Sequence, residues 1–201
     1  MQWDVMNFRN ALRGARNPMN SWDKSDSGPA EDGGFVIGED DLRLASRLCR
    51  AGSDERKFMR QIFCSVDITA PLYWWKEFDT YKIGTVANST STMHKIHTKP
   101  FTVSDFSYDH IIADSMSVLQ STVEHLESLR VKYNDTRDKR VWYTIIQLLP
   151  SSYNQLRTVT LNYENLVNIY AARRNHKLNE WHTLCDWIEQ LPYAGELIVM
   201  P

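Results

Sequence analysis

The stretch that decides the fold is Leu148–Arg174, which reads LLPSSYNQLRTVTLNYENLVNIYAARR. After a proline and a polar turn, an extended run ends at Asn162, and a helix follows. Asn162 is a favourable N-cap residue, and Glu164 puts a carboxylate in the first turn, where it suits the helix dipole. The apolar side chains that repeat at helical spacing, and so predict its buried face, are Leu166, Ile169 and Tyr170. This stretch therefore predicts a strand that runs directly into a capped helix.

Arg173 lies on the same face as those apolar residues, about 16 Å beyond the cap at a rise of about 1.5 Å per residue. Its guanidinium cannot lose its charge, so it must meet an anion, a carbonyl oxygen or water. A structural ion pair is one interpretation, and a side chain that extends into solvent is a second. A site that holds an anionic or polar ligand is the third.

A second block upstream repeats the pattern of a strand followed by a helix. Residues alternate in polarity over Gln61–Ile68, and this predicts a strand with one face in the core. Cys64 falls on the core face, which favours a small packing residue over a nucleophile. Thr69-Ala70-Pro71 then opens a helix with proline in its first turn, and the aromatic run Leu72–Trp75 continues it.

The remaining periodicity predicts more helix than strand. Four further helices are expected, over Glu39–Ala51, Asp114–Asn134, Asp138–Leu149 and Leu178–Leu191. Three further strands are expected, over Met1–Asn7, Phe101–Phe106 and Gln155–Leu161. Residues 17–34 are rich in Gly, Pro, Ser and Asp and predict a flexible loop. The chain is therefore expected to be a single α+β domain over residues 1–201, with a small, mostly antiparallel sheet flanked by long helices.

Composition excludes some function classes. The chain has 201 residues, a formal net charge of -2 and 42% hydrophobic residues, which is typical of a globular protein and not of a nucleic-acid binder. Its three cysteines are far apart, and we expect reduced thiols in the cytoplasm. No apolar run approaches the ~18 residues of a membrane span.

Several smaller patterns favour packing over chemistry. His94 and His97 are three residues apart, but a third metal ligand is not evident, so we expect no metal site. His182 and Cys185 have apolar neighbours, which favours a packed helix. Trp74 and Trp75 could stack on a flavin or a base, although aromatic residues on a helix more often form core or a subunit interface. No glycine-rich phosphate motif is present, so nothing favours a dinucleotide-binding or P-loop fold.

Several of these residues form a pattern that resembles the C-terminal half of flavin-dependent thymidylate synthases. The residues that carry it are Leu149-Pro150, Tyr153, Asn162, Asn168 and Arg173. In that family the first asparagine and the one six residues later contact FAD, and the arginine eleven residues after the first holds the uracil of dUMP. The resemblance implies these roles for Asn162, Asn168 and Arg173. Arg174 is the reserve for the last role, because it keeps the family's distance to Trp181.

The N-terminal half resembles the family in framework. Ala15-Arg16 and the helix that ends at Gly52 stand where the family has an alanine–arginine pair and a helix ending in glycine. A serine soon after that pair touches FAD in the family, and Ser21 is its nearest counterpart. The strand, Ala70-Pro71 and hydrophobic helix also follow in the family's order.

The family signature itself is altered. It reads Arg-His-Arg, two residues, Ser, one residue, Asn-Glu, one residue, Ser, one residue, Arg. Counted without gaps from Ala70-Pro71, the positions that face it are Thr80, Tyr81, Lys82, Thr85, Ala87, Asn88, Thr90 and Thr92. A shift of one residue puts Asn88 on the asparagine and Ser91 on the serine, but restores no arginine. The polar character of the signature survives, and its cationic clamp is weaker, with Lys82, His94, Lys95 and His97 as the available sources of charge. A Ser/Thr-rich surface loop is the alternative interpretation of this segment.

By resemblance, the candidate site residues divide into two sets. The candidates for holding the flavin are Asn162, Asn168, Thr80, Tyr81 and Lys82. The candidates for holding the nucleotide are Arg173, Arg174, Glu77, Asn88, Thr90 and Ser91, and Arg173 is also the catalytic candidate. The resemblance implies the fold of thymidylate synthase-complementing proteins, in a diverged, phage-type member.

The family's chemistry sets the expected function. It methylates dUMP with methylenetetrahydrofolate as carbon donor and FAD as hydride source, with NADPH as reductant and no cysteine nucleophile. Its members are cytoplasmic homotetramers whose active sites are shared between subunits. We therefore expect a pyrimidine nucleotide as ligand and neither a nucleic-acid polymer nor a membrane as partner. The alternatives are a non-catalytic homologue that binds a nucleotide or a protein, and a structural α+β protein with only architectural similarity.

Overall fold

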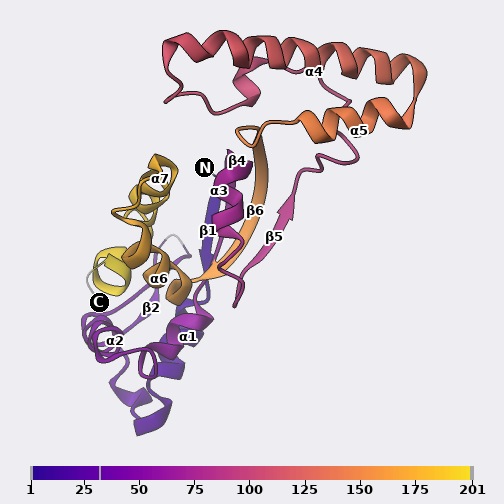
Figure 1. Cartoon of the computed structure of the whole chain (residues 1–201). Coiled ribbons are helices and arrows are strands. Elements are labelled where there is room, and N and C mark those ends of the chain that lie inside the picture. The colour runs from indigo at the N-terminus through magenta and orange to yellow at the C-terminus, as the bar shows by residue number, and fades with distance from the viewer. Residues whose placement is uncertain (1, 32, 200–201) are drawn as a thin grey trace. The chain divides into compact units, whose positions relative to one another are not determined.

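The computed structural model describes residues 2–31 and 33–199, and its residues cluster into two compact units (Figure 1). The first unit comprises the described residues of Met1–Asp67, Tyr81–Ala87 and Val159–Pro201. The second unit comprises Ile68–Thr80 and Asn88–Thr158. The chain is α+β, as the sequence predicts, and each unit is described by itself below.

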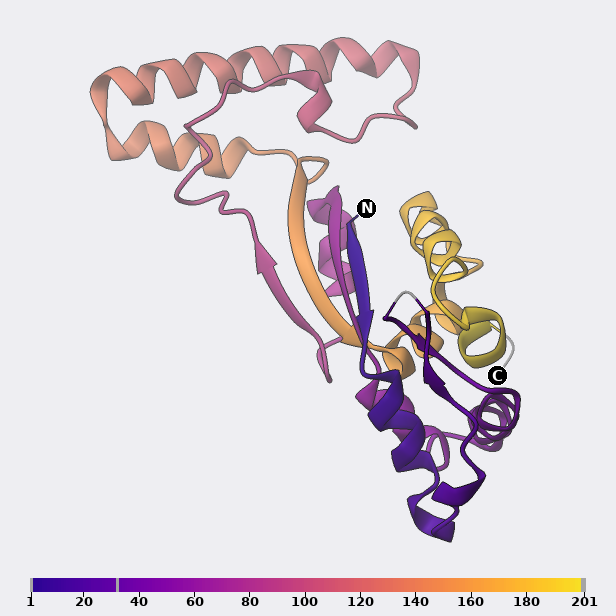
Figure 2. The same cartoon turned by 180° about the vertical axis from the view of Figure 1, so that it is seen from behind.

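The main sheet has the strand order β1-β4-β6-β5. These strands are β1 (Trp3–Met6), β4 (Phe63–Pro71), β6 (Asn154–Asn162) and β5 (Val86–Ser89). β1 and β4 are antiparallel, with Trp3 opposite Val66, and they lie side by side in both views (Figures 1 and 2). Cys64 is fully buried on β4, as its place in the alternating pattern predicts.

The first unit builds its core from several helices and the strands β1 and β4. The helices are α1 (Phe8–Ala15), α2 (Glu39–Ala51), η3 (Arg56–Gln61), α6 (Tyr163–Arg173), α7 (Asn179–Ile188) and a π-helical turn η6 (Gly195–Val199). Tyr163, at the start of α6, is fully buried and meets the edge of the Phe8 ring at a centroid distance of 5.4 Å. Leu166 and Ile169 are also fully buried and Tyr170 nearly so, which confirms the predicted buried face of α6.

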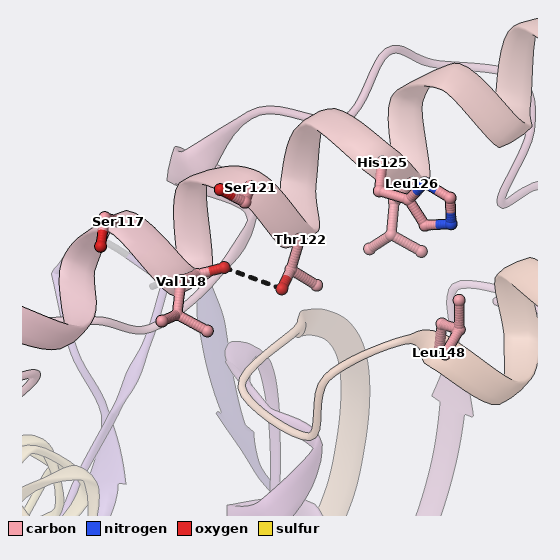
Figure 3. Close-up of a pocket in the computed structure, with 7 residues that line it drawn as sticks. All are labelled: Ser117, Val118, Ser121, Thr122, His125, Leu126 and Leu148. Carbon is pink, nitrogen blue, oxygen red and sulfur yellow. Dashed lines mark hydrogen bonds between the residues drawn. The ribbon is translucent and has the colours of Figure 1, made fainter.

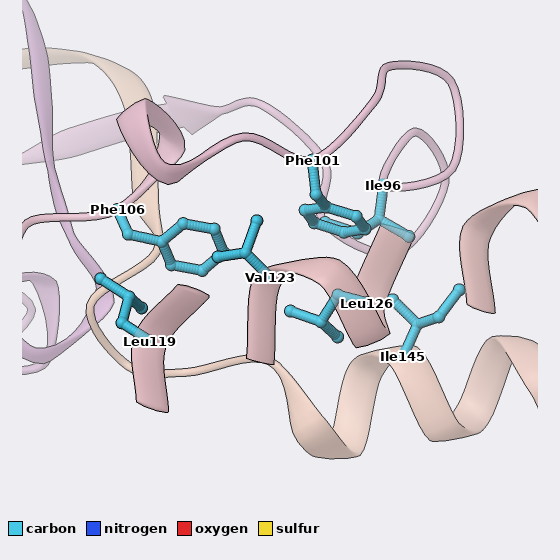
Figure 4. Close-up of a cluster of buried hydrophobic side chains, with 7 residues drawn as sticks. All are labelled: Ile96, Phe101, Phe106, Leu119, Val123, Leu126 and Ile145. Atoms are coloured by element: carbon cyan, nitrogen blue, oxygen red, sulfur yellow. The ribbon is translucent and has the colours of Figure 1, made fainter. Parts of the chain in front are cut away.

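The second unit contains α3 (Leu72–Phe78) and the long hairpin of α4 (Met116–Thr136) and α5 (Lys139–Leu148), which the two views show side by side (Figures 1 and 2). Figure 4 shows side chains from both hairpin helices meeting the loop before them. That cluster consists of Ile96, Phe101, Phe106, Leu119, Val123, Leu126 and Ile145. In α3, Trp74 and Trp75 are 1% exposed, so both are core residues of the chain.

One predicted strand is wrong, and the other three have shifted bounds. At Phe101–Phe106 the chain forms a 3-10 turn, η4 (Val103–Asp105), because Thr102 and Asp105 cap each other. Only Phe106 pairs, in a single bridge with Tyr153. The strand predicted over Gln61–Ile68 begins at Phe63 and runs on to Pro71, so that proline is the N-cap of α3 and not part of its first turn.

The helix predicted over Glu39–Ala51 has those bounds, and the other predicted helices differ by a few residues at their ends. Met1 and Asp32, in the predicted strand and loop, lie outside the described residues. Within residues 17–34 the chain forms two 3-10 turns, η1 (Asn17–Met19) and η2 (Trp22–Lys24), and a two-residue ladder of β2 (Gly28–Pro29) with β3 (Phe35–Val36). α1, β5 and η6 are elements that the sequence reasoning missed.

A buried ion pair anchors this N-terminal segment. Asp41 is 1% exposed and accepts a hydrogen bond from the Arg16 Nε at 2.5 Å. Ser25 and Ser27 donate their hydroxyls to the same carboxylate. Burial alone would raise the pKa of Asp41, but the hydrogen bonds from Ser25, Ser27 and Arg16 outweigh it and lower that pKa. Arg16, in the alanine–arginine pair noted in the sequence, therefore has a structural partner.

Candidate functional site

The first turn of α6 is closed by a reciprocal pair of asparagines. The Asn162 Oδ1 accepts from the Asn165 backbone N–H at 3.0 Å, and the Asn165 Oδ1 accepts from the Asn162 N–H at 3.1 Å. This capping box confirms the predicted N-cap and satisfies two donors that a helix start leaves open. The Asn165 Nδ2 also donates to the Ile83 carbonyl at 2.8 Å, which ties the segment before β5 to the helix.

Gly84 allows this segment to approach Asn162 closely. Its φ is +72°, and a Cβ at this position would lie 2.7 Å from the Asn162 Nδ2. A side chain at residue 84 would be strained by the positive φ and would displace the Asn162 amide. Thr85 follows, and its Oγ1 is buried with no hydrogen-bond partner among the described residues. Thr85 therefore carries an unsatisfied hydroxyl in the segment that approaches Asn162.

Asn168 lies one and a half turns further along α6 and is exposed. Its Oδ1 accepts a hydrogen bond from the Arg56 Nη2 at 3.3 Å. The Arg56 Nε in turn lies 3.5 Å from the Glu164 Oε1. Arg60 completes the group by pairing with both carboxylate oxygens of Glu164. Glu164 is 7% exposed, so these two arginines compensate a buried charge.

Arg173 ends α6 between two aromatic rings. Its Nε donates to the Tyr81 hydroxyl at 2.9 Å, and its guanidinium carbon lies 4.5 Å from the centroid of the Trp181 ring. Tyr81 and Trp181 meet edge to face at 5.9 Å. The two rings fix the plane of the Arg173 guanidinium.

Arg174 is engaged elsewhere, although it follows directly in the sequence. Its Nη1 pairs with Glu189, and its guanidinium lies 5.0 Å from the Tyr170 ring. The Tyr170 hydroxyl donates to the same Glu189 oxygen at 2.7 Å. Arg174 therefore stabilises the packing of α6 on the end of α7, and Arg173 is the better candidate for a ligand.

The other residues near the altered signature make mostly local contacts. The Thr80 N–H and hydroxyl both bond to the Glu77 carbonyl, which ends α3. Lys82 is exposed. The Thr90 N–H and hydroxyl bond to the Leu156 carbonyl, and the Ser91 hydroxyl accepts from the His94 N–H at 2.9 Å. Asn88 is exposed on β5, so this part of the predicted loop is an edge strand.

The candidates are thus distributed over both units. The first unit contains Tyr81, Lys82, Asn162, Asn168, Arg173 and Arg174, and the second contains Glu77, Thr80, Asn88, Thr90 and Ser91. Within the first unit, the contact between Arg173 and Tyr81 joins two candidates that are far apart in sequence. Sequence reasoning missed Arg56 and the pairing of Glu164. The sequence gives no clear signal for them, because Arg56 and Arg60 lie in a 3-10 helix and pair with a carboxylate more than 100 residues away.

The pockets lie away from these candidates. A groove of about 580 Å³ runs along α4 and is lined by hydroxyls, His125 and Leu148 (Figure 3). A cavity of about 650 Å³ lies beside the end of α1 and includes Phe58 and Arg60. A third, of about 510 Å³, includes Arg16, Lys24 and Arg47. Ser21, the counterpart of the family's FAD-contacting serine, lines the third pocket, and the other predicted flavin and nucleotide residues line none of these three.

The thiols are not arranged as nucleophiles. Cys49, Cys64 and Cys185 are buried and unpaired. Burial raises the pKa of Cys49 and of Cys64 to about 12, and that of Cys185 to about 11. In the described part of the chain, no group of three or more His, Cys, Asp or Glu side chains could hold a metal ion. Nor does any helix there have the length and apolar character that crossing a membrane requires.

The residues present fit a flavin at its neutral, hydrogen-bonding parts. Asn162, Asn168 and the unsatisfied hydroxyl of Thr85 are donors and acceptors of the kind that a flavin ring and its ribityl chain require. Lys82 is a cation in the segment that follows α3, as a diphosphate would require.

No known protein-family model and no curated protein sequence matches this chain. Solved structures do match it. One is the flavin-dependent thymidylate synthase ThyX from Helicobacter pylori in complex with FAD and dUMP, with 18% identity, 98% of each chain covered and a TM-score of 0.72. A second structure of that enzyme with FAD and dUMP has 19% identity, 98% of this chain and 97% of the other covered, and a TM-score of 0.73. The chain therefore has the fold of the flavin-dependent thymidylate synthases.

Proposed function

We propose that this chain is a diverged, FAD-dependent thymidylate synthase-like protein that binds a pyrimidine nucleotide and methylates it. The observation that carries the proposal is the Arg173 cluster. An arginine at the position that the resemblance assigns to the uracil is held between Tyr81 and Trp181. The cluster stands in a fold whose likeness to the enzyme complexes extends over almost the whole chain.

Arg173 has the chemistry that activation of a uracil ring requires. A positive charge beside a pyrimidine carbonyl favours the anionic form of the ring, and this raises electron density at the carbon that accepts the methylene group. The Tyr81 hydroxyl accepts a hydrogen bond from the Arg173 Nε, which holds the two side chains together. Glu77, Asn88, Thr90 and Ser91 remain the proposed contacts for the rest of the nucleotide.

Asn162, Asn168, Thr80, Tyr81 and Lys82 would hold the flavin, with methylenetetrahydrofolate and NADPH as co-substrates. When bound, the flavin supplies the hydride for the new methyl group. The protein's residues orient the two rings and exclude water from the site. We also propose that the protein is a cytoplasmic homotetramer.

The test is the visible absorption spectrum of the purified protein with FAD, before and after addition of dUMP. We expect a bound-flavin spectrum that dUMP perturbs, because both ligands would occupy one site. Absence of flavin binding under all conditions would overturn the proposal. Light scattering gives the mass in solution, and a monomer would contradict the proposed tetramer.

A non-catalytic homologue that binds a nucleotide or a protein partner is the second candidate. The observation that favours it is the replacement of signature arginines by Thr80 and Thr92. Turnover distinguishes the two: a protein that binds FAD and dUMP but forms no dTMP with methylenetetrahydrofolate and NADPH is the homologue.

A further inference from the structure

Two arginines, Arg56 and Arg60, contact the carboxylate of Glu164. Arg60 alone occupies both of its oxygens, with Nε on one and Nη2 at 3.3 Å from the other. This two-pronged contact is the strongest that a carboxylate makes with an arginine. Arg56 adds a second guanidinium, with its Nε 3.5 Å from the Oε1 of the same carboxylate group.

Arg56 is also held in a fixed orientation. Its side chain is 17% exposed, compared with 54% for Arg60. Its Nε points to Glu164, and its Nη2 donates to the amide oxygen of Asn168 at 3.3 Å. Its Nη1 makes no hydrogen bond to any residue that the structure describes. A guanidinium held at two nitrogens loses little entropy when the third binds a ligand.

The asparagine that Arg56 contacts is a proposed flavin residue. An anionic group on a flavin bound at Asn168 would therefore lie near the Arg56 guanidinium. We propose that Arg56 binds the diphosphate of the flavin dinucleotide. This inference rests on the proposed function, because it assumes that Asn168 contacts FAD.

The experiment compares FAD with riboflavin, which has the same ring but no phosphate. Affinities of the full-length protein for both are measured by quenching of flavin fluorescence. In Arg56→Gln we expect FAD affinity to fall about 10- to 100-fold, the usual loss for a hydrogen bond to a charged group. Riboflavin affinity should stay within about threefold, because the only contact to the ligand that is lost is the one to phosphate.

Arg60→Gln is the matched control, because it removes the same charge from the same carboxylate but no contact with Asn168. Its FAD affinity should stay within about threefold of the unaltered protein. Arg56→Lys keeps the positive charge but cannot contact Glu164 and Asn168 through two separate nitrogens, so it should give an intermediate FAD affinity. It also serves as the test if Arg56→Gln does not fold.

Three results would overturn the inference and leave the proposed function standing. They are unchanged FAD affinity in Arg56→Gln, an equal loss for riboflavin, and an equal loss of FAD affinity in Arg60→Gln. If the unaltered protein binds neither flavin, the proposed function fails, and the inference fails with it.

Discussion

The two regions that the family resemblance brings to attention differ in what their polar side chains do. In α6, each matching residue also supports the fold: Asn162 caps the helix, Asn168 holds Arg56, and Arg173 packs on Trp181. Between Glu77 and Thr92 no signature position is identical in the ungapped register. The Thr80 hydroxyl closes a local turn, and the Thr90 hydroxyl bonds to the backbone of β6. The family's residue types are thus present where folding also requires them. A match at such positions supports the fold first, and ligand binding needs a separate measurement.

The largest expected effect separates the two functions of Arg173. Arg173→Ala should lower dUMP affinity about 100-fold or more, because a charged hydrogen-bond donor to the uracil is lost. Its unfolding free energy should fall by only about 1 kcal/mol, the value of a cation–π contact at a partly exposed site. Titration calorimetry and urea denaturation measure the two quantities.

Arg174→Ala is the control for that variant, because Arg174 pairs with Glu189 outside the aromatic cluster. Its dUMP affinity should stay within about threefold. If Arg173→Ala binds dUMP as tightly as the unaltered protein, the role assigned to Arg173 is wrong.

The next effect concerns the buried charge beside Asn168. Glu164→Ala should cost about 2–3 kcal/mol of unfolding free energy, because it leaves Arg56 without its carboxylate. Solvent around the half-exposed Arg60 keeps the cost below that of a fully buried pair. Glu164→Gln keeps an acceptor oxygen and should cost less. An alanine variant as stable as the unaltered protein would contradict the compensation argued for this cluster.

Two substitutions of Asn162 distinguish its role in helix capping from its proposed role in flavin binding, and their expected effect on stability is smaller than that of Glu164→Ala. Asn162→Ala should destabilise the protein by about 1 kcal/mol through loss of the N-cap. Asn162→Asp keeps the cap and should retain stability, but it removes the amide N–H and so should weaken flavin binding. Thermal unfolding and flavin titration of both variants provide the comparison, and equal flavin affinity in Asn162→Asp would show that the amide serves only the helix.

The smallest effect is a dependence of stability on pH through Asp41. Its pKa is lowered from the ordinary 3.8, so its stabilisation is complete above that value and is lost as the pH falls through the lower folded pKa. Asp41→Asn should therefore be less stable near neutrality and should lose less stability on acidification below about pH 4. Urea denaturation across pH 2–7 measures this, and parallel curves for the two proteins would contradict it.

The sequence predicts the parts of the fold in which periodicity and caps agree. Helix α6 is the best example, because Asn162 begins it and its apolar face follows at regular spacing. The prediction of a strand over Phe101–Phe106 was wrong. The spacing of its aromatic residues resembles that of a strand, but Thr102 and Asp105 close a turn that hydropathy does not detect. Of the candidate site, the resemblance supplied Arg173, but the contact between Arg56 and Asn168 depends on packing between distant segments.

The tight approach of Gly84 to the Asn162 amide has a consequence for sequence change. A side chain at residue 84 would need both a tolerated positive φ and a smaller group at residue 162. Residue 84 is thus expected to change only together with residue 162, and a library that randomises residue 84 alone should return glycine. Selection experiments on this protein should therefore randomise residues 84 and 162 as one unit.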